Sequence, residues 1–555
     1  MALGGLFKKP RLYSSPKNIA YIRPDSTMEV TDAFIIYANP DLASTKEVAL
    51  IKPPIIFSKN AYSTPVTMPL GLAYLAAVLH KARYPVKILD CPGLGIDKVR
   101  LTPNKKFNVQ GIDAKESIKR ISPQADIIGI SIMFSQEWPH VRDYIRQIRK
   151  AFPDAIIIVG GEHPTAMAEY TLRDCPQIDY IVLGEGELTL LEMVYKLRSG
   201  QVLHNISGIA YIKEGAFHQN GLTPRIASIK EMPWPKWDLI DMEAYFQPNF
   251  SMGIGHGRNI AMLATRGCPY QCTFCSNPTM WATRYVMRSV KDVVDEIAYN
   301  IEMYGANSID FYDLTAIVRK DWIIEFTNEL ERRNLKVTWQ LPSGTRSESL
   351  DEEVIRGLAK TGCEFLVYAP ESGSKQTLDM IKKRVVLKNM EKSIMTALRY
   401  GIIVKLNFII GFPFERRKNM WETLLWAWKM ALKKVDDANI ATFTPYPGSE
   451  LFEELRKEKA IDEMNDAYFE DLMTQFDFTK SRTFCRHVPE YEVFFYRIFG
   501  MSVFYMLSYA RVPSRIFRLL RFLFQKGHFQ PRSLFEQRVY DIAARKGKLS
   551  TVSLH

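Results

Sequence analysis

Three cysteines in one short loop are the strongest chemical signal in the sequence. Cys268, Cys272 and Cys275 follow one another with C-x3-C-x2-C spacing. Thiols this close together can converge on one centre. A zinc site would need a fourth Cys or His with its own paired spacing, whereas an iron–sulfur cluster tolerates three thiolates and leaves one iron open. The spacing favours a cluster over zinc or unrelated cysteines, and an open iron is a place for chemistry.

The elements around this loop alternate between strand and helix. The loop directly follows the first of six expected strands, and amphipathic helices such as residues 289–305 separate the strands. The expected strands are 259–265, 308–313, 337–343, 365–371, 404–413 and 439–447. Six strand–helix repeats predict a partial (β/α)6 barrel over residues 259–450, with its chemistry at the carboxyl ends of the strands.

A second alternation precedes the barrel. Residues 48–230 contain short apolar strands that end in Gly or Ser and are separated by helices. This pattern is typical of a doubly wound parallel sheet, so the fold class is α/β. The remaining parts are interpreted as an N-terminal arm (1–47), a linker rich in Pro and Trp (231–258) and a helical, basic C-terminal region (451–555).

The composition excludes several classes of protein. Of 555 residues, 47% are hydrophobic and 24% charged, which is ordinary for a packed protein and excludes global disorder. Seven cysteines are too few, and odd in number, for a secreted disulfide scaffold. The N-terminus has no apolar core of a secretory signal, and no run of 18 apolar residues predicts a membrane-spanning helix. We therefore expect a cytoplasmic protein.

The positive charge is concentrated near the C-terminus. Residues 511–548 hold ten Lys or Arg against Glu536 and Asp541, so this tail carries eight of the twelve net positive charges. Apolar side chains such as Ile516 and Leu520 recur there at helical spacing, and the stretch before it (492–510) is very apolar. The pattern fits a helical cap on the main domain or a basic amphipathic helix on an anionic membrane surface. It disfavours nucleic acid as a partner.

The cysteine loop, RGCPYQCTFC (266–275), resembles the signature loop of radical S-adenosylmethionine (SAM) enzymes, including the aromatic Phe274. Segments that resemble later parts of the family pattern are FYDLT (311–315), YAPESGSKQTL (368–378), NFIIGFPFE (407–415) and TPYPGSEL (444–451). The resemblance implies a 4Fe-4S cluster on the three cysteines, with SAM on the open iron. It also implies SAM contacts from Phe274, Asp313, Arg346 and Glu371, although Asp313 and Arg346 also fit ordinary strand-end polar residues.

Residues 48–200 resemble the cobalamin-binding domain of one radical SAM subclass. The segments that carry this resemblance are PLGLAYLAAVL (69–79), GISIMFS (129–135), VGGEHPT (159–165) and VLGEGELT (182–189). It implies cobalamin at the carboxyl ends of the strands. The candidates for its contacts are Ser131, Gly160, Gly161, His163, Gly184, Glu185 and Gly186. Where cobalamin mutases carry the His of D-x-H-x-x-G, the turn DCPGLG (90–95) has Pro92, so this turn offers cobalt no His ligand. Without the resemblance such a sheet suits many nucleotides, and an empty, degenerate domain is an alternative.

The resemblance predicts an enzyme that methylates an unactivated carbon through a 5′-deoxyadenosyl radical. The apolar C-terminal region favours a hydrophobic substrate, such as a tetrapyrrole or a lipid. A one-electron donor such as flavodoxin or ferredoxin is implied as a partner. Two alternatives are an oxidative cyclase of the magnesium-protoporphyrin ester type and a non-enzymatic corrinoid- or metal-binding module. A methylthiotransferase is disfavoured, because it would need more N-terminal cysteines than Cys91 and Cys175.

Overall fold

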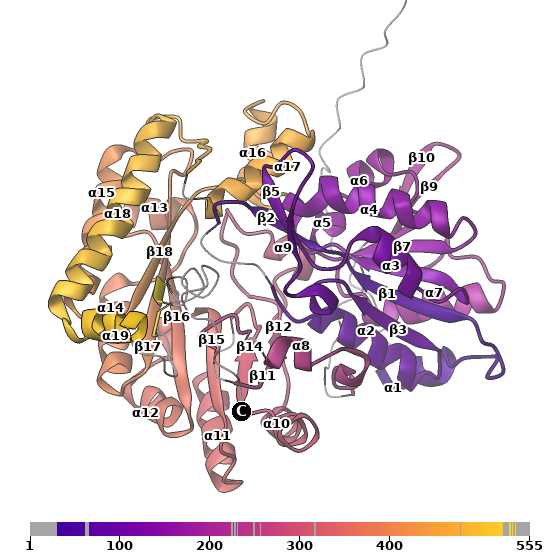
Figure 1. Ribbon diagram of the computed structural model, residues 1–555, viewed down its shortest axis with the longest axis horizontal. Helices are drawn as coiled ribbons and strands as arrows, with labels where there is room; N and C mark the ends of the chain where they lie inside the picture. Colours follow the sequence, from indigo (N-terminus) through magenta and orange to yellow (C-terminus); the bar gives the residue numbers. More distant parts are fainter. Residues whose placement is uncertain are drawn as a thin grey trace, which may run out of the picture.

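Two α/β lobes lie side by side in the computed structural model of this chain (Figure 1). Most of the expected N-terminal arm and most of the basic tail beyond residue 524 lie outside the residues that the structure describes. The structure describes residues 30–524 without 62–65, 222, 224–225, 227–228, 230, 248–249, 256, 316–317 and 478. It also describes residues 532, 533, 535, 536 and 539.

The N-terminal lobe is built on a seven-stranded sheet with the order β10-β9-β8-β7-β6-β1-β3. Neighbours from β3 to β8 are parallel, and β9 and β10 add an antiparallel edge. The strands are β1 (Glu47–Lys52), β3 (Val86–Asp90), β6 (Ala125–Ser131), β7 (Ile156–Gly160), β8 (Tyr180–Val182), β9 (Ile209–Lys213) and β10 (Ala216–Gln219). The helices are α1 (Val30–Ile36), α2 (Leu70–Lys81), α3 (Ala114–Arg120), α4 (Trp138–Ala151), α5 (Glu162–Ala166), α6 (Ala168–Asp174) and α7 (Glu187–Arg198).

Helices cover both faces of this sheet, which confirms the doubly wound prediction. Leu50 and Ile158 pack with residues of α2 and α7 on one face, whereas Ile51 and Ile157 pack with residues of α4 and α6 on the other. The central strands are apolar on both faces because neither face meets water.

A three-stranded antiparallel sheet, absent from the sequence interpretation, lies at the edge of this lobe. It has the order β2-β5-β4, with β2 (Ile55–Ser58), β4 (Val99–Leu101) and β5 (Phe107–Gln110). All three residues of β4 are exposed. With three residues, β4 is too short to give a periodic signal in the sequence, and β2 has only four residues.

The second lobe contains the predicted partial barrel. Its six strands have the order β11-β14-β15-β16-β17-β18, and all neighbours are parallel. The strands are β11 (Asn259–Met262), β14 (Ser308–Phe311), β15 (Thr338–Thr345), β16 (Cys363–Glu371), β17 (Ile403–Ile410) and β18 (Asp437–Thr442), with a separate pair β12 (Thr265–Arg266) and β13 (Val286–Met287). The helices are α8 (Glu243–Phe246), α9 (Asn277–Trp281), α10 (Val290–Tyr304), α11 (Lys320–Arg332), α12 (Glu352–Lys360), α13 (Lys375–Met380), α14 (Leu387–Arg399) and α15 (Arg417–Leu432).

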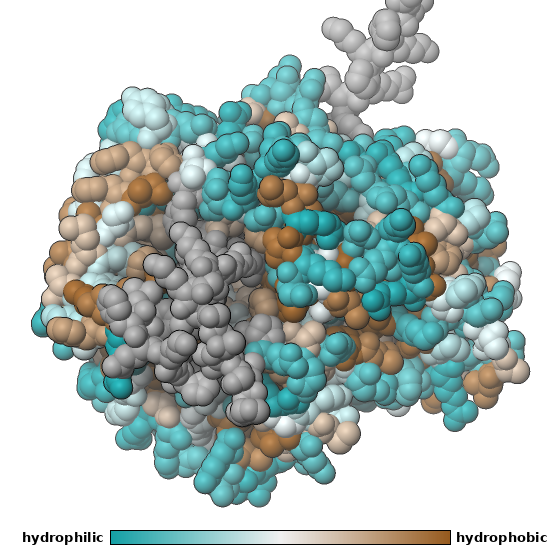
Figure 2. All heavy atoms as spheres, viewed as in Figure 1, coloured by the Kyte–Doolittle hydropathy of each residue, from teal (hydrophilic) through white to brown (hydrophobic). Residues whose placement is uncertain are grey.

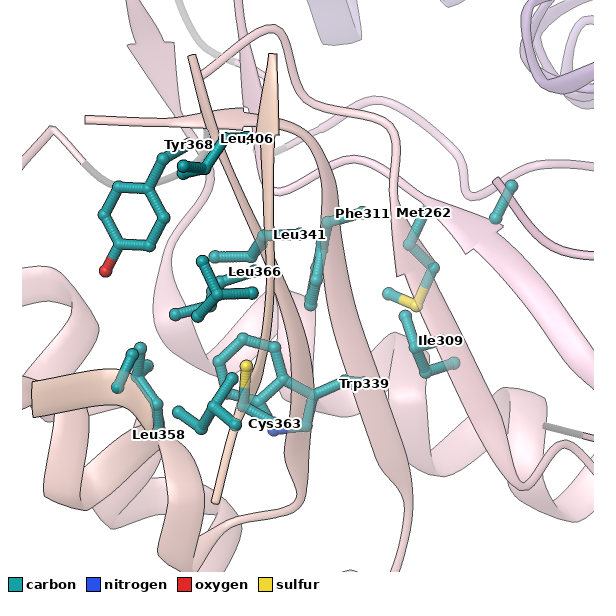
Figure 3. Packing of buried hydrophobic residues seen from close by; sticks show 14 of the residues in the cluster. Met262, Ile309, Phe311, Trp339, Leu341, Leu358, Cys363, Leu366, Tyr368 and Leu406 are labelled. Atoms are coloured by element: carbon teal, nitrogen blue, oxygen red, sulfur yellow. The ribbon is translucent and has the colours of Figure 1, made fainter. Parts of the chain in front are cut away.

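The outer face of the barrel strands is a continuous apolar core under the helices. Figure 3 shows Phe311, Trp339, Leu366 and Leu406 gathered there. The expected linker is packed rather than loose, because Trp237 and its neighbours in α8 belong to the same core.

The C-terminal part is helical, as predicted, in α16 (Glu450–Lys457), α17 (Asp466–Asp471), α18 (Glu490–Arg511) and α19 (Ser514–Phe524). Helix α18 packs along α15 and β18. Among the described residues it is the one helix whose length and apolar composition would suffice to cross a membrane, although no uninterrupted apolar run predicted it. Its Arg497 is buried and donates to the backbone carbonyls of Asp477 (2.9 Å) and Gln475 (2.7 Å).

Candidate active site

The cysteine loop lies between β12 and α9 and is held by backbone hydrogen bonds from both sides. The Cys275 amide donates to the Cys272 carbonyl (3.1 Å), and the Thr273 amide donates to the Ile381 carbonyl (3.1 Å). The Asn277 side chain donates to the Cys268 carbonyl (3.2 Å). All three cysteines are free thiols, half-buried in the loop. The loop is therefore shaped by the protein before any cofactor binds.

The donor set fits an iron–sulfur cluster better than a zinc ion. In the described part of the chain, no three His, Cys, Asp or Glu side chains converge on one metal ion. A mononuclear zinc site requires that convergence, whereas each cysteine of a cluster binds its own iron. Three thiolates leave the fourth iron of a 4Fe-4S cluster without a protein ligand. Cys268, Cys272 and Cys275 would hold the cluster.

Burial and two cations set the charge state of these thiols. Burial raises the pKa of Cys268 and Cys272, and it raises that of Cys275 to about 12, so the metal-free thiols are protonated. The positive charges of Lys383 and Arg346 oppose this rise at Cys268 and Cys272. Thiolates form when metal binds, so cluster assembly releases protons.

Carboxyl ends of four neighbouring strands surround the loop, as the barrel prediction requires. Phe274 of the loop lies against Phe412, which follows β17 (ring centroids 5.8 Å apart). Arg346, after β15, stacks on the ring of Tyr270 in the loop (3.8 Å from the ring centroid). Its buried Nε has no hydrogen-bond partner, so it is a donor available to a ligand.

Glu371 ends β16 with a positive φ of 63°, a backbone conformation that is uncommon for a residue other than glycine. Its carboxylate is paired with Lys383 at 2.8 Å, and both side chains are largely buried. Burial alone would lower the pKa of Lys383, but Glu371 and Cys272 raise it above its ordinary value. The sequence did not reveal Lys383, because no motif marks a partner that tertiary structure supplies.

Asp313 lies beneath the loop and positions it. Its carboxylate accepts hydrogen bonds from the Ala264 amide (3.1 Å) and from the Thr265 amide and hydroxyl (both 2.5 Å). Burial raises its pKa to about 6. Both oxygens are thus engaged with the strand that leads into the loop, and a direct contact between Asp313 and SAM stays a prediction.

The glycines predicted for cobalamin lie at the carboxyl edge of the N-terminal sheet, but they differ in their need for glycine. Gly161 has φ +117°, and an added Cβ would meet the Ile132 carbonyl oxygen at 2.4 Å. Gly184 has φ +70°. At Gly160 and Gly186 an added Cβ would make only ordinary contacts, at 3.5 Å. Ser131 ends β6 at the same edge, and its contact with cobalamin stays a prediction.

His163 and Glu185, also expected at the periphery of cobalamin, both have protein partners, and their contacts with cobalamin stay predictions. Both ring nitrogens of His163 are engaged, with Ser135 (3.0 Å) and Thr171 (3.3 Å), and the ring stacks on Trp138. Burial lowers its pKa to about 3, so the ring is neutral. Glu185 is buried and faces Arg266 of the other lobe. The first residue stabilises the lobe, and the second joins the two lobes.

Three polar side chains that the sequence analysis did not single out lie at this edge instead. Lys52, Asp90 and Glu137 come from the ends of β1 and β3 and from the turn after β6. Tyr245 donates to one oxygen of Asp90 (2.5 Å), while the other oxygen is buried without a partner. Burial raises the pKa of Glu137 to about 7. An unpartnered acceptor suits the peripheral amides of a corrin ring, so this edge fits cobalamin.

The carboxyl edges of the two sheets face each other. Arg266, just before the cysteine loop, pairs with Glu187 (2.7 Å) and Glu185 (3.2 Å) of the N-terminal lobe. Ser276, just after the loop, donates to Glu162 of α5. The cysteine loop therefore lies against the Gly-rich edge, and cofactors bound at both would lie close to each other.

A further polar strip lies on the inner face of the barrel, opposite the helix-facing core. Lys405 and Asn407 of β17 pair in register with Asp437 and Asn439 of β18. The side-chain oxygens of both asparagines are buried without a partner. Burial lowers the pKa of Lys405, although Asp437 opposes this. These groups can bind polar substituents of a substrate.

Comparisons with known proteins agree with this arrangement. The B12 binding domain family matches residues 60–194, and the Radical SAM superfamily matches residues 262–427. An uncharacterized methyltransferase of Pyrococcus horikoshii is 31% identical over 408 residues, which are 73% of this chain and 82% of the relative.

Two further relatives have named activities. A cytidylyl-2-hydroxyethylphosphonate methyltransferase of Streptomyces wedmorensis is 27% identical and covers 78% of this chain and 85% of its own length. An anaerobic magnesium-protoporphyrin IX monomethyl ester cyclase of Rubrivivax gelatinosus is 29% identical and covers 61% of this chain and 60% of its own length.

Two solved structures share the fold at 16% identity. The radical SAM methyltransferase TsrM of Kitasatospora setae, with cobalamin and a [4Fe-4S] cluster bound, has a TM-score of 0.61 and covers 83% of this chain and 89% of its own. The cobalamin-dependent SAM radical enzyme OxsB, with aqua-cobalamin and SAM bound, has a TM-score of 0.63 and covers 91% and 76%.

Proposed function

Because the chain belongs to the radical SAM enzymes that carry a B12-binding domain, we propose that it methylates an unactivated carbon of a hydrophobic substrate. Its cofactors are a 4Fe-4S cluster, SAM and cobalamin. Membership also makes it an enzyme, so the alternative of a non-catalytic binding module was wrong.

The observation that carries the proposal is the meeting of two strand edges. The cysteine loop and the Gly-rich edge are joined by Arg266 with Glu185 and Glu187, and by Ser276 with Glu162. Methyl transfer to a carbon radical needs the site of hydrogen abstraction and the methyl donor to face one substrate. A substrate held between the two edges meets that requirement.

The chain's own residues hold and orient the groups. When bound, the cluster and SAM supply a 5′-deoxyadenosyl radical and cobalamin supplies the methyl group. Cys268, Cys272 and Cys275 anchor the cluster. Glu371 and Arg346 place a fixed negative and a fixed positive charge at its rim, which suit the amino and carboxylate groups of SAM. The electron enters from a small donor protein such as flavodoxin or ferredoxin.

A tetrapyrrole or a lipid is the substrate class we propose. A magnesium-protoporphyrin ester appears in the name of one relative, and the C-terminal helix α18 is strongly apolar. The strip formed by Lys405, Asn407 and Asn439 supports a substrate that also carries polar groups, as the carboxylates of a tetrapyrrole would. Oxidative ring closure is the second candidate, because the cyclase is 29% identical to this chain.

Methyl-labelled SAM distinguishes these chemistries. The anaerobically reconstituted enzyme, a one-electron reductant and labelled SAM are incubated with a magnesium-protoporphyrin ester or with a polar lipid extract. Labelled product establishes methylation. Deoxyadenosine with an unlabelled, oxidised product establishes ring closure instead.

The matched control is Cys275→Ala, which should lower both iron content and deoxyadenosine formation to background. A Cys275→Ala enzyme that retains its iron and still cleaves SAM would overturn the assignment of the cluster.

A further inference from the structure

An exposed apolar surface covers the outer side of the barrel lobe on α15, α18 and α19. We call it the apolar face, and we define it by the exposed residues Trp421, Leu425, Phe495, Met506, Phe517 and Leu520. Met506 and Phe517 are each 70% exposed and Leu425 is 57% exposed. Figure 2 shows this area in tan and brown, over the helices that Figure 1 labels α15 and α18. Contiguous apolar surface of this kind marks an interaction site.

Helix α18 is apolar on two sides. Val493, Gly500 and Phe504 form its buried side against the barrel. Phe495 and Met506 recur at helical spacing on the opposite, exposed side. A helix that only capped the barrel would carry polar residues there. The exposed side therefore needs an explanation beyond the fold.

Helix α19 has its apolar side toward the exterior, because a buried arginine on its other side binds the barrel lobe. Arg515 is buried and pairs with Asp436 (2.9 Å), and it donates to the Val435 carbonyl (3.0 Å). Ile516, Phe517 and Leu520 are consequently exposed. A helix on a water-exposed surface has the opposite arrangement, with charge outside and apolar groups inside.

The residues among and beside the apolar groups match an anionic bilayer. Lys418 lies on the same stripe of α15 as Trp421 and Leu425, is 85% exposed and lies 4.0 Å from Glu422. Lys429 continues this stripe and pairs with Glu391 at 2.6 Å. Trp421 contacts Phe499, which stacks on Phe495, so aromatic rings gather at the centre. Aromatic rings with flanking basic residues are typical of the interface between lipid headgroups and acyl chains. The net charge of +12 adds attraction to anionic lipid.

We propose that the apolar face docks this enzyme on the surface of an anionic membrane, with α15, α18 and α19 lying on the bilayer. The contacts of Arg497 indicate that α18 lies on the membrane and does not cross it. Its guanidinium is buried and bound to the carbonyls of Thr474, Gln475 and Asp477, so α18 cannot leave the barrel without losing these bonds. The proposal rests on the surface alone, and it stands whether or not the substrate is a lipid.

Co-sedimentation of the full-length, reconstituted enzyme with vesicles tests the proposal. We expect binding to vesicles of phosphatidylcholine with phosphatidylglycerol, and at least about tenfold weaker binding to phosphatidylcholine alone. Phe495→Glu with Phe517→Glu should weaken binding to the anionic vesicles at least about tenfold, because two apolar anchors are replaced by like charges. Val202→Glu, at an exposed apolar residue of the other lobe, is the matched control and should bind as the wild type does.

A fluorescence measurement on the unaltered surface complements the variants. Brominated phosphatidylcholine in the same vesicles should quench part of the tryptophan emission, and Trp421→Phe should remove that quenching. Absence of vesicle binding overturns the proposal, as does binding that Phe495→Glu with Phe517→Glu leaves unchanged. A concentration-dependent dimer that the same pair of substitutions dissolves would identify the apolar face as a self-interface instead.

Discussion

The ion pair between Glu371 and Lys383 couples two buried charges beside the cysteine loop. Both side chains are largely buried at a separation of 2.8 Å. Replacing Lys383 with Met leaves the carboxylate without its cation in a site poor in water. We expect a loss of about 3 kcal/mol in stability of the metal-free protein, measured as a fall in the midpoint of thermal unfolding.

The double variant provides the control for this coupling. Glu371→Gln together with Lys383→Met removes both charges, so it should recover part of the stability lost by Lys383→Met alone. A double variant as unstable as the sum of the two single variants would show that the groups act independently.

At the scale of single residues, those that belong to a local sequence motif can be predicted, whereas those whose role depends on a partner in the folded chain cannot. Cys268, Cys272 and Cys275 could be predicted as cluster ligands because the prediction rests on their local spacing alone. Lys383 was missed because no local motif marks it, and only the folded chain brings it to Glu371. His163 has a plausible position in the Gly-rich turn, yet it points to Ser135 and Thr171 in the core. Sequence order alone does not determine on which side of a turn a side chain lies.

The turn after β7 is an element whose backbone demands glycine at one position only. Gly161→Ala would place a Cβ 2.4 Å from the Ile132 carbonyl oxygen at φ +117°. We expect a loss of more than about 2 kcal/mol in stability, together with weaker binding of cobalamin. Gly160→Ala is the matched control, since its Cβ would approach the Val182 carbonyl oxygen no closer than 3.5 Å. Thermal midpoints of the two variants that fall equally would contradict this reading of the turn.

The turn after β17 contains a carboxyl group that should make stability depend on pH. Glu415 accepts from the Gly411 amide (2.7 Å) and the Thr377 hydroxyl (3.0 Å). Burial raises its pKa from 4.5 to about 7. Between these two values the folded protein binds a proton that the unfolded chain has lost, so stability falls as pH rises through this window. The full effect is on the order of 3 kcal/mol.

Glu415→Gln, which cannot titrate, isolates this effect. The thermal midpoint of the wild type minus that of Glu415→Gln should decrease from pH 5 to pH 8. A difference that stays constant across this range would mean that Glu415 has an ordinary pKa.

At the scale of elements, the apolar strands of both sheets and most helices were predictable, because each buries a periodic set of apolar side chains. The sheet formed by β2, β4 and β5 was not, since its strands are only three or four residues long. Helix α19 shows a second limit. Its amphipathic pattern is plain in the sequence, but its orientation depends on the pairing of Arg515 with Asp436, which only the folded chain brings together.

At the scale of the whole molecule, the relation between the lobes is what the sequence could not supply. Two sheets with chemistry at their carboxyl edges were predicted, but not that these edges face each other. Arg266 makes that contact, because its guanidinium lies between Glu185 and Glu187 and over the ring of Tyr74 in the N-terminal lobe (4.9 Å). All three charged side chains are buried. Without the guanidinium the two carboxylates would therefore remain buried and unpaired, which is costly in free energy.

Arg266→Met should therefore separate the lobes, whereas a comparable change inside one lobe should not. Removing the cation that faces two buried carboxylates costs about 3–5 kcal/mol, and the charge repulsion acts across the interface. We expect a larger radius of gyration in small-angle X-ray scattering. Arg288→Met is the matched control: Arg288 is equally buried and pairs with Glu296 and Asp292, all within the barrel lobe. It should lower the thermal midpoint without changing the radius. Equal scattering by both variants would show that other contacts hold the two lobes together, and that Arg266 stabilises only its own neighbourhood.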